Sequence, residues 1–387
     1  MCSGSAEIRS KDFYNTGGEE HLSSATLEMK VHMKLLKFCI LLIAATALLS
    51  CIDPSGVKMK IEQKDATSQN LLFVTTYDHL YGFDQNSFEQ KVKINFDRRN
   101  IGYGAKTPDG RIILADRGRT GGGWGSRLLV LDQNFNIIKE IETNPMPMDP
   151  VLFGNYIFVG CASFVNDGPK RNSIEIFDAS TYEKVKEIPV EFDIERPEYS
   201  EDNENVYIAV TNLRKDKFPY IISVNKTNLE VNQISYFEPS YNIQRYILKT
   251  IDSVLLASSY SVPSGVCINI LDITNNQAIA SVKLDTLTSL ATSNMTFLLT
   301  PTLIDGKLHF PMKSYKPPYT RIVTLSFPEL ELLEIKTPDH SYDPWSTDYY
   351  YLDDTLLVTY GQSSGPNYGL NLISMPSGDI VKHAPLD

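Results

Sequence analysis

The sequence predicts an all-β fold made of one repeated unit, and three observations carry this prediction. After Cys51 no long stretch shows helical periodicity, whereas short runs of β-branched and aromatic residues recur between turn residues. A motif in which an apolar residue precedes Asp, Asn or Pro returns seven times, at spacings of 46 to 56 residues. In most repeats a second turn signal, such as Asp109-Gly110 or Asp305-Gly306, separates the first strand from the second. Four strands in a repeat of roughly 45 residues are the signature of a β-propeller.

The seven turn motifs predict seven blades. Asp and Asn side chains cap backbone amides in such turns, and Pro presets φ. The first blade requires residues 57–63 as its inner strand. A six-bladed ring with one extra hairpin is the alternative, whereas a pair of β-sandwiches would not keep a constant period. The motifs are Phe83-Asp84, Leu131-Asp132, Phe177-Asp178, Val224-Asn225, Leu271-Asp272, Phe327-Pro328 and Met375-Pro376, and the expected blades are 57–97, 101–143, 147–190, 194–237, 243–285, 296–337 and 345–384.

Residues 33–50 have the three parts of an export signal. Met33–Lys37 is basic, the twelve residues from Phe38 to Leu49 are apolar, and Ser50 precedes a cysteine. The apolar run is too short to span a bilayer as a stable helix. We therefore predict a signal peptide over 33–50, a tether over 51–56 and the propeller over 57–387. Residues 1–32 precede the basic region, and we expect them to be an upstream mis-start that is disordered if it is made.

The segment Leu48-Leu49-Ser50-Cys51 resembles the lipobox of bacterial lipoproteins, with an aliphatic residue at −3 and a small residue at −1. The resemblance implies that Cys51 is lipidated and anchors the protein in a membrane of the cell envelope, and we expect the outer membrane. An ordinary secretory signal ending in a chance cysteine is the alternative. The repeat resembles YVTN and TolB-like propellers, which include WD40-like repeats, and with the lipobox it is similar to propeller lipoproteins of the Bacteroidota type. Neither resemblance assigns a reaction.

Composition narrows the set of partners. The chain has 42% hydrophobic and 21% charged residues and a formal net charge of −11. Residues 1–50 carry five basic and five acidic residues, so removal of the signal leaves the balance acidic. Nucleic acid is therefore excluded as the main partner, because it selects basic proteins. Cys161 and Cys267 lie in apolar runs of different repeats, and we expect free thiols and a monomeric protein.

Six irregular insertions lie between the second and third strands of the repeats, and in a propeller these connections emerge on one face. Although the protein is acidic, they are rich in Arg, Lys, Tyr and Trp, which suit a small-molecule, glycan or peptide ligand that is anionic or sugar-like. The insertions are Ala115–Ser126, Ala162–Ser173, Thr211–Tyr220, Ser258–Val266, Phe310–Thr320 and Thr359–Gly369. The predicted ligand-binding residues are Arg117, Arg119, Trp124, Arg171, Arg214, Lys313 and Tyr315, with Trp345 from a link between blades.

No HExxH, Walker or EF-hand motif occurs, and a non-catalytic binding protein without a cofactor is the leading interpretation. The alternative is a metal-assisted hydrolase or lyase at the mouth of the channel, in which Asp149, Glu198 and Asp343 would hold a divalent cation. A third possibility is an envelope assembly or scaffold module that docks peptides by strand addition.

Overall fold

The structure is a computed structural model, and the chain divides into two units, Met1–Val57 and Lys58–Asp387. The residues that the structure describes are 57–119, 124–162, 172–190, 197–210, 220–234, 243–261, 265–275, 277–284, 296–298, 300–314, 320–337, 346–353, 356–361 and 369–385.

These residues form strands and short turns, with one 3-10 helix, η1 (Ser68–Asn70), between β1 and β2. In chain order the strands are β1 (Lys60–Lys64), β2 (Leu71–Thr76), β3 (His79–Asp84), β4 (Gln90–Asn95), β5 (Arg99–Lys106), β6 (Ile112–Arg119), β7 (Trp124–Leu131), β8 (Ile137–Glu142), β9 (Pro147–Phe153), β10 (Tyr156–Cys161), β11 (Ser173–Asp178), β12 (Lys184–Pro189), β13 (Glu198–Glu201), β14 (Asn205–Val210), β15 (Tyr220–Asn225), β16 (Val231–Ile234), β17 (Ile243–Ile251), β18 (Val254–Ser261), β19 (Gly265–Asp272), β20 (Gln277–Lys283), β21 (Thr296–Leu298), β22 (Thr302–Ile304), β23 (Lys307–Ser314), β24 (Thr320–Ser326), β25 (Leu332–Lys336), β26 (Ser346–Asp353), β27 (Leu356–Gly361), β28 (Gly369–Ser374) and β29 (Ile380–Pro385).

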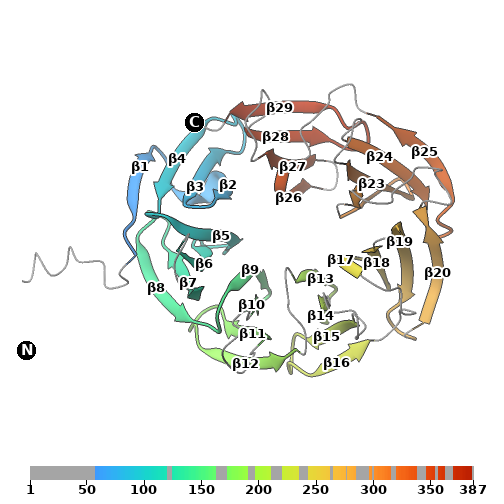
Figure 1. Ribbon diagram of the computed structural model, residues 1–387, viewed down its shortest axis with the longest axis horizontal. Coiled ribbons are helices and arrows are strands. Elements are labelled where there is room, and N and C mark those ends of the chain that lie inside the picture. The colour runs from blue at the N-terminus through green and yellow to red at the C-terminus, as the bar shows by residue number, and fades with distance from the viewer. Residues whose placement is uncertain are drawn as a thin grey trace, which may run out of the picture. The chain divides into compact units, whose positions relative to one another are not determined.

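The strands form antiparallel sheets that follow one another around a central axis, as Figure 1 shows, and the predicted β-propeller is confirmed. Seven sheets lie within the described ranges, and their limits agree with the repeats expected from the turn motifs. Five of them run from an inner strand to an outer strand in chain order, for example β5-β6-β7-β8. In a sixth, β21 and β22 pair with successive parts of β23, so together they make an interrupted inner strand.

The first sheet departs from the prediction. Its order is β1-β4-β3-β2, so β1 pairs with the outer strand β4 and is not the inner strand expected from residues 57–63. The sequence of β1, Lys-Ile-Glu-Gln-Lys, explains this placement. Four of its five residues are polar and four are exposed, which suits an outer edge and not a position enclosed by neighbouring blades.

The turn motif works as its chemistry predicts. The carboxylate of Asp178 accepts hydrogen bonds from the backbone amides of Ser180 and Thr181 at 2.8 and 2.9 Å. Asp84, Asp132, Asn225 and Asp272 cap the corresponding turns through the same side-chain oxygen. In the last two sheets Ser326 and Ser374 occupy the position of the capping residue, and the cis peptides Phe327-Pro328 and Met375-Pro376 lie within the turns that follow. Each motif therefore closes the hairpin between the third and fourth strands of its sheet.

Three of these turns contain a bulky, buried residue with a positive φ. Phe88, Phe135 and Leu330 have φ of 62°, 67° and 60°, which is uncommon for residues with bulky side chains. All three side chains are buried, and the Phe135 ring packs edge-on against Phe73 of the first sheet, with 6.2 Å between ring centroids. Burial of the side chain therefore compensates for the unfavourable backbone conformation.

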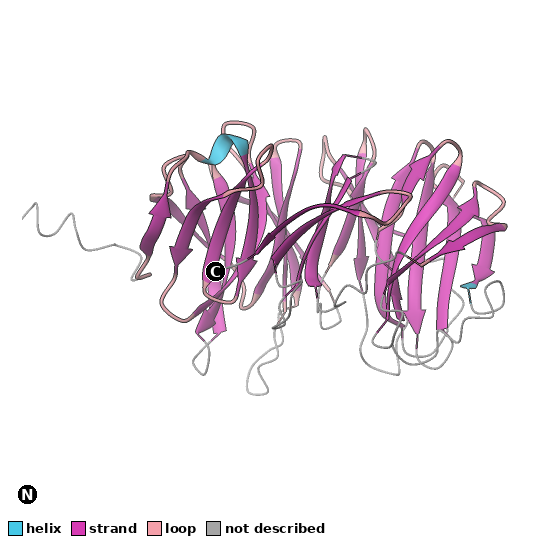
Figure 2. Cartoon of the chain, turned by 90° about the horizontal axis from the view of Figure 1, so that it is seen from above, coloured by secondary structure: helices cyan, strands magenta, loops and turns pink. Residues whose placement is uncertain are grey.

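The last sheet closes the ring against the first by side-chain packing. Leu370, Leu372 and Ala384 join one buried cluster with residues of β2 and β3, among them Leu72 and Phe83. The Lys382 ammonium reaches the carbonyl of Asn86 and lies 5.7 Å from the centroid of the Phe88 ring. Figure 2 shows the strands from the side, with η1 at the end of the sheets where Ser68 hydrogen-bonds to the Gly110 turn. Within the described part of the chain, no helix is long and apolar enough to cross a membrane.

Candidate functional site

The β6–β7 hairpin is more regular than the sequence predicted. Residues Ala115–Ser126 were expected to be an irregular insertion, but β6 continues to Arg119 and β7 begins at Trp124. Gly118 pairs with Trp124, and Asp116 pairs with Arg127. Arg117, Arg119 and Trp124 are therefore strand positions at the end of a hairpin. The backbone alone is described for Arg119 and Trp124.

Two glycines of this segment serve the hairpin itself. Gly118 has a φ of 104°, a conformation that favours glycine, and its amide donates a hydrogen bond to Asp116 Oδ1 at 3.1 Å. A Cβ atom on Gly125 would lie 2.0 Å from the carbonyl oxygen of Asp116. Gly125 thus permits the close approach of β7 to β6, and the Gly118 amide holds the Asp116 side chain in place.

Asp116 is the centre of a buried ion cluster. Its side chain is 0% exposed, and its Oδ2 accepts hydrogen bonds from Arg99 Nη1 and from Arg127 Nε, the latter at 2.9 Å. Arg127 also donates from Nη1 to Glu140. Burial alone would lower the pKa of Arg127, but its interactions with Asp116 and Glu140 outweigh this effect and raise the pKa. A buried carboxylate held by two guanidinium groups and a backbone amide is rigid.

This cluster borders a cleft of about 470 Å³ on the second sheet. The cleft is lined by Arg99, Asp116, Gly125, Ser126, Arg127, Glu140 and Glu142. Its volume falls within the range of roughly 300–1,000 Å³ that is common for small-ligand sites, although its lining is polar where most such sites are apolar. The sequence pointed to this hairpin through Arg119 and Trp124, but it did not predict the carboxylates of Asp116 and Glu140, because only the strand register brings them to the arginines.

Arg117 lies on the opposite side of β6 from Asp116, since successive residues of a strand point to opposite faces. Its guanidinium forms an ion pair with Asp149 of β9 and so links the second sheet to the third. A Cβ on Gly102 would lie 2.6 Å from Arg117 Nη2, so Gly102 leaves the space that this arginine occupies. Arg117 Nε is buried and has no hydrogen-bond partner within the described part of the chain. The structure therefore places Arg117 outside the cleft at Asp116.

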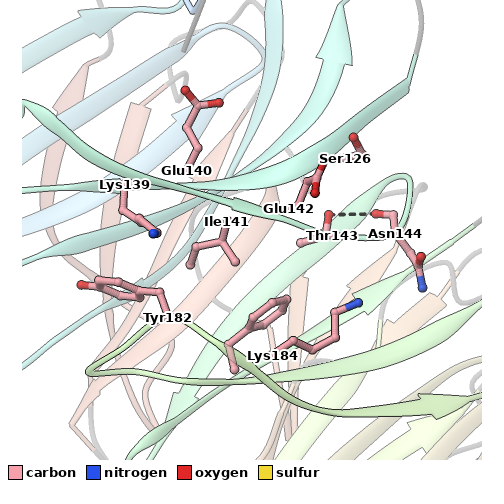
Figure 3. Close-up of a pocket in the computed structure, with 10 residues that line it drawn as sticks. Ser126, Lys139, Glu140, Ile141, Glu142, Thr143, Asn144, Tyr182 and Lys184 are labelled. Carbon is pink, nitrogen blue, oxygen red and sulfur yellow. Dashed lines mark hydrogen bonds between the residues drawn. The ribbon is translucent and has the colours of Figure 1, made fainter. Parts of the chain in front are cut away.

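A second cleft, of about 520 Å³, lies between the outer strand β8 and the third sheet. Figure 3 shows Lys139, Tyr182 and Lys184 around it, with Thr143 Oγ1 donating to the Asn144 carbonyl at 2.8 Å. Lys184 pairs with Glu175, which is fully buried and also accepts a hydrogen bond from the Asn144 amide at 3.1 Å. Glu140 lines both clefts.

Both cysteines of the propeller are free thiols. Burial and the nearby Glu175 carboxylate, whose Oε2 lies 3.6 Å from the sulfur, raise the pKa of Cys161 well above its ordinary value. Burial also raises the pKa of Cys267, which is only partly buried. Neither thiol therefore has the lowered pKa of a nucleophilic cysteine.

Two residues of the metal hypothesis, Asp149 and Glu198, lie within the described ranges. Asp149 pairs with Arg117, which competes with a cation for the same carboxylate. Burial chiefly raises the pKa of Tyr199, and the charges of Asp149 and Glu198 add to the effect. Within the described ranges no three His, Cys, Asp or Glu side chains are arranged to hold a metal ion. Asp343 lies outside those ranges.

Most other predicted binding residues fall outside the described part of the chain, namely Arg171, Arg214, Tyr315 and Trp345. Lys313 is a backbone position near the end of β23, where it pairs with Thr320. Because β23 and β6 are both second strands of their sheets, Lys313, Arg119 and Trp124 belong to corresponding ends of equivalent hairpins. The repeat brings such ends to one face of a propeller.

No family model and no curated protein matches the chain. Among solved structures, the dihydro-heme d1 dehydrogenase NirN in complex with DHE resembles it with a TM-score of 0.53 at 14% identity, covering 85% of this chain and 68% of its own. Hsv2 of Kluyveromyces lactis gives a TM-score of 0.52 at 12% identity, with 84% and 98% covered. Hydrazine synthase of Kuenenia stuttgartiensis gives 0.51 at 13% identity, with 70% and 75% covered. At this identity the likeness shows a shared fold alone, and the chain is a β-propeller.

Proposed function

We propose that this protein is a lipid-anchored β-propeller of the cell envelope that binds a polar ligand without transforming it. The proposed binding site is the cleft at the end of the β6–β7 hairpin, in which the backbone of Arg119 pairs with Arg99 and Trp124 precedes Gly125. The observation that carries the proposal is the buried Asp116 carboxylate, which fixes Arg99 and Arg127 beside an open polar cleft. Preorganised charged groups next to a cleft lower the entropic cost of binding a ligand.

The binding proposal is tested on the full chain purified in detergent. Ligand retention is measured by calorimetry with neutral oligosaccharides, acidic oligosaccharides and acidic peptides as probes, in buffer that contains a chelator. We expect at least one probe class to bind, and the Arg119→Ala, Trp124→Ala double variant to bind it at least tenfold more weakly. Glu183→Gln, an exposed change in a turn of the third sheet, is the matched control. Binding that depends on a divalent cation, or that ignores the hairpin variant, would contradict the proposal.

The anchor is tested separately. The motivating feature is the basic region, apolar run and cysteine of residues 33–51. Mass spectrometry of the protein from its own host is expected to show an N-terminal Cys51 carrying acyl chains. A Cys51→Ser variant should leave the membrane fraction, because two or more acyl chains are what give stable anchoring. A mature chain that begins at another residue, or that stays on the membrane without Cys51, would rule the anchor out.

A further inference from the structure

We infer that the ligand of the cleft at Asp116 is a neutral saccharide rather than an anion. The inference rests on the proposed function and adds the chemical class of the ligand. It follows from three properties of the cleft lining: its charge balance, its alternation of donors and acceptors, and the rigidity of its charged groups.

The charge balance of the cleft disfavours an anion. Its lining holds two arginines, Arg99 and Arg127, against the three carboxylates of Asp116, Glu140 and Glu142. Both arginines donate to Asp116, and Arg127 also donates to Glu140. An anionic ligand would meet an excess of negative charge from these three carboxylates. The sequence left an anionic or a sugar-like ligand open, and the strand register supplies carboxylates that neutralise the arginines.

The same lining suits hydroxyl groups. A guanidinium offers N–H donors, a carboxylate offers acceptors, and each sugar hydroxyl both donates and accepts. Arg127 and Glu140 are joined by a hydrogen bond, so a donor and an acceptor lie side by side at the cleft. Two adjacent hydroxyl groups of a pyranose can bond to both groups at once. The exposed side chain of Glu142 and the hydroxyl of Ser126 extend this polar surface.

The charged groups are also held in place before a ligand arrives. Asp116 is wholly buried and is fixed by the Gly118 amide, while the Arg99 and Arg127 side chains are only 14% and 21% exposed. A small neutral sugar loses its own hydration on binding and gains no ion pair in return. It therefore needs partners that are already ordered, and this cleft supplies them.

The test compares three probes on the full chain by calorimetry: a set of neutral hexasaccharides with glucose, xylose and mannose units, hexagalacturonate, and hexaglutamate. We expect a neutral hexasaccharide to bind more tightly than either anion. Glu140→Gln and Glu142→Gln, which keep the side-chain size, should each weaken that binding about tenfold, since hydrogen bonds to charged groups are stronger than neutral ones. Both changes should strengthen the binding of hexagalacturonate. Glu183→Gln should change neither.

The outcomes separate the inference from the proposed function. Tighter binding of hexagalacturonate or hexaglutamate to the unmodified chain would overturn the inference and leave a binding site at the hairpin. Failure of every neutral hexasaccharide to bind would overturn it too. If none of the three probe classes binds, the proposed function fails as well. Unfolding curves of the Gln variants identify any loss of binding that comes from loss of the fold.

Discussion

At the scale of single residues, the ion pairs of the candidate site join residues that are distant in the sequence. Asp116 and Arg99 are 17 positions apart, and Glu140 and Arg127 are 13 apart, yet each pair forms an ion pair across strands. These contacts depend on strand register, because a slip of one residue would turn each side chain to the other face of the sheet. No local sequence motif could therefore predict them. The sequence did single out the segment Ala115–Ser126 and its arginines, because composition alone carries that signal.

Removal of the Asp116 carboxylate is expected to destabilise the fold. Asp116→Ala leaves the largely buried Arg99 and Arg127 without their shared counter-ion, and breaking such a buried pair costs about 3 kcal/mol. Asp116→Asn retains hydrogen-bond acceptance and should cost less. Urea unfolding followed by circular dichroism gives both values, with Glu183→Ala as the surface control. Equal stability of Asp116→Ala and the control would show that the cluster does not support the fold.

His309 is expected to make stability depend on pH. Burial, and then the charges of Lys307 and Lys336, lower the pKa of this histidine, which hydrogen-bonds to Thr324 at 3.0 Å. The unfolded chain therefore takes up a proton at a higher pH than the folded chain, so stability falls as pH drops below about 6.5. Urea unfolding of the wild type between about pH 7.5 and pH 5 should show this loss, and His309→Gln should reduce it. An identical pH dependence in the two proteins would contradict the assignment.

At the scale of elements, the turn between the third and fourth strands is the most predictable part of the fold. Its capping residue acts locally, so the motif and its role could be identified from the sequence alone. The prediction that residues 57–63 form the inner strand of the first blade is wrong. It rested on the number of strands that a blade needs and not on the composition of these residues. Lys60–Lys64 has too little apolar surface for an inner strand, and it pairs with the outer edge of β4.

The Asp178 turn provides a prediction at this scale. Hydrogen bonds from Ser180 and from the backbone of Thr181 lower the pKa of Asp178 to about 2. The folded state therefore favours the ionised carboxylate, and this stabilisation is present above the ordinary value of 3.8 and is lost as pH falls toward about 2. NMR titration of the side chain measures the pKa directly. Asp178→Asn should be tolerated better than Asp178→Ala, because Asn225 caps the equivalent turn in the next blade. A pKa near 3.8 would exclude the capping role.

At the scale of the whole molecule, the described sheets are joined by packing between blades and not by a strand that the first and last sheets share. The constant period of the turn motifs predicted the propeller, while the closing contacts depend on residues almost 300 positions apart, such as Lys382 and Asn86. Such distant pairs have no characteristic spacing in the sequence, so the closing contacts follow only from the three-dimensional structure.

The closing contact should be important for the stability of the ring. Leu370→Ala removes a fully buried side chain from the cluster between the last and first sheets, at an expected cost of about 2–5 kcal/mol. Val381→Ala, an exposed change on the adjacent outer strand, is the control and should cost far less. Thermal unfolding followed by circular dichroism compares them. A Leu370 variant as stable as the Val381 variant would mean that the ring is closed elsewhere.

The central claim is that the cleft beside Asp116 is the ligand site of this propeller. A crystal structure of the full chain with a bound neutral hexasaccharide tests it most directly. The account predicts sugar hydroxyl groups within hydrogen-bond distance, about 3 Å, of the guanidinium of Arg99 or Arg127 and of the Glu140 carboxylate. A saccharide bound at the opposite end of the sheets, or a cleft that stays empty while the saccharide binds elsewhere, would contradict the claim.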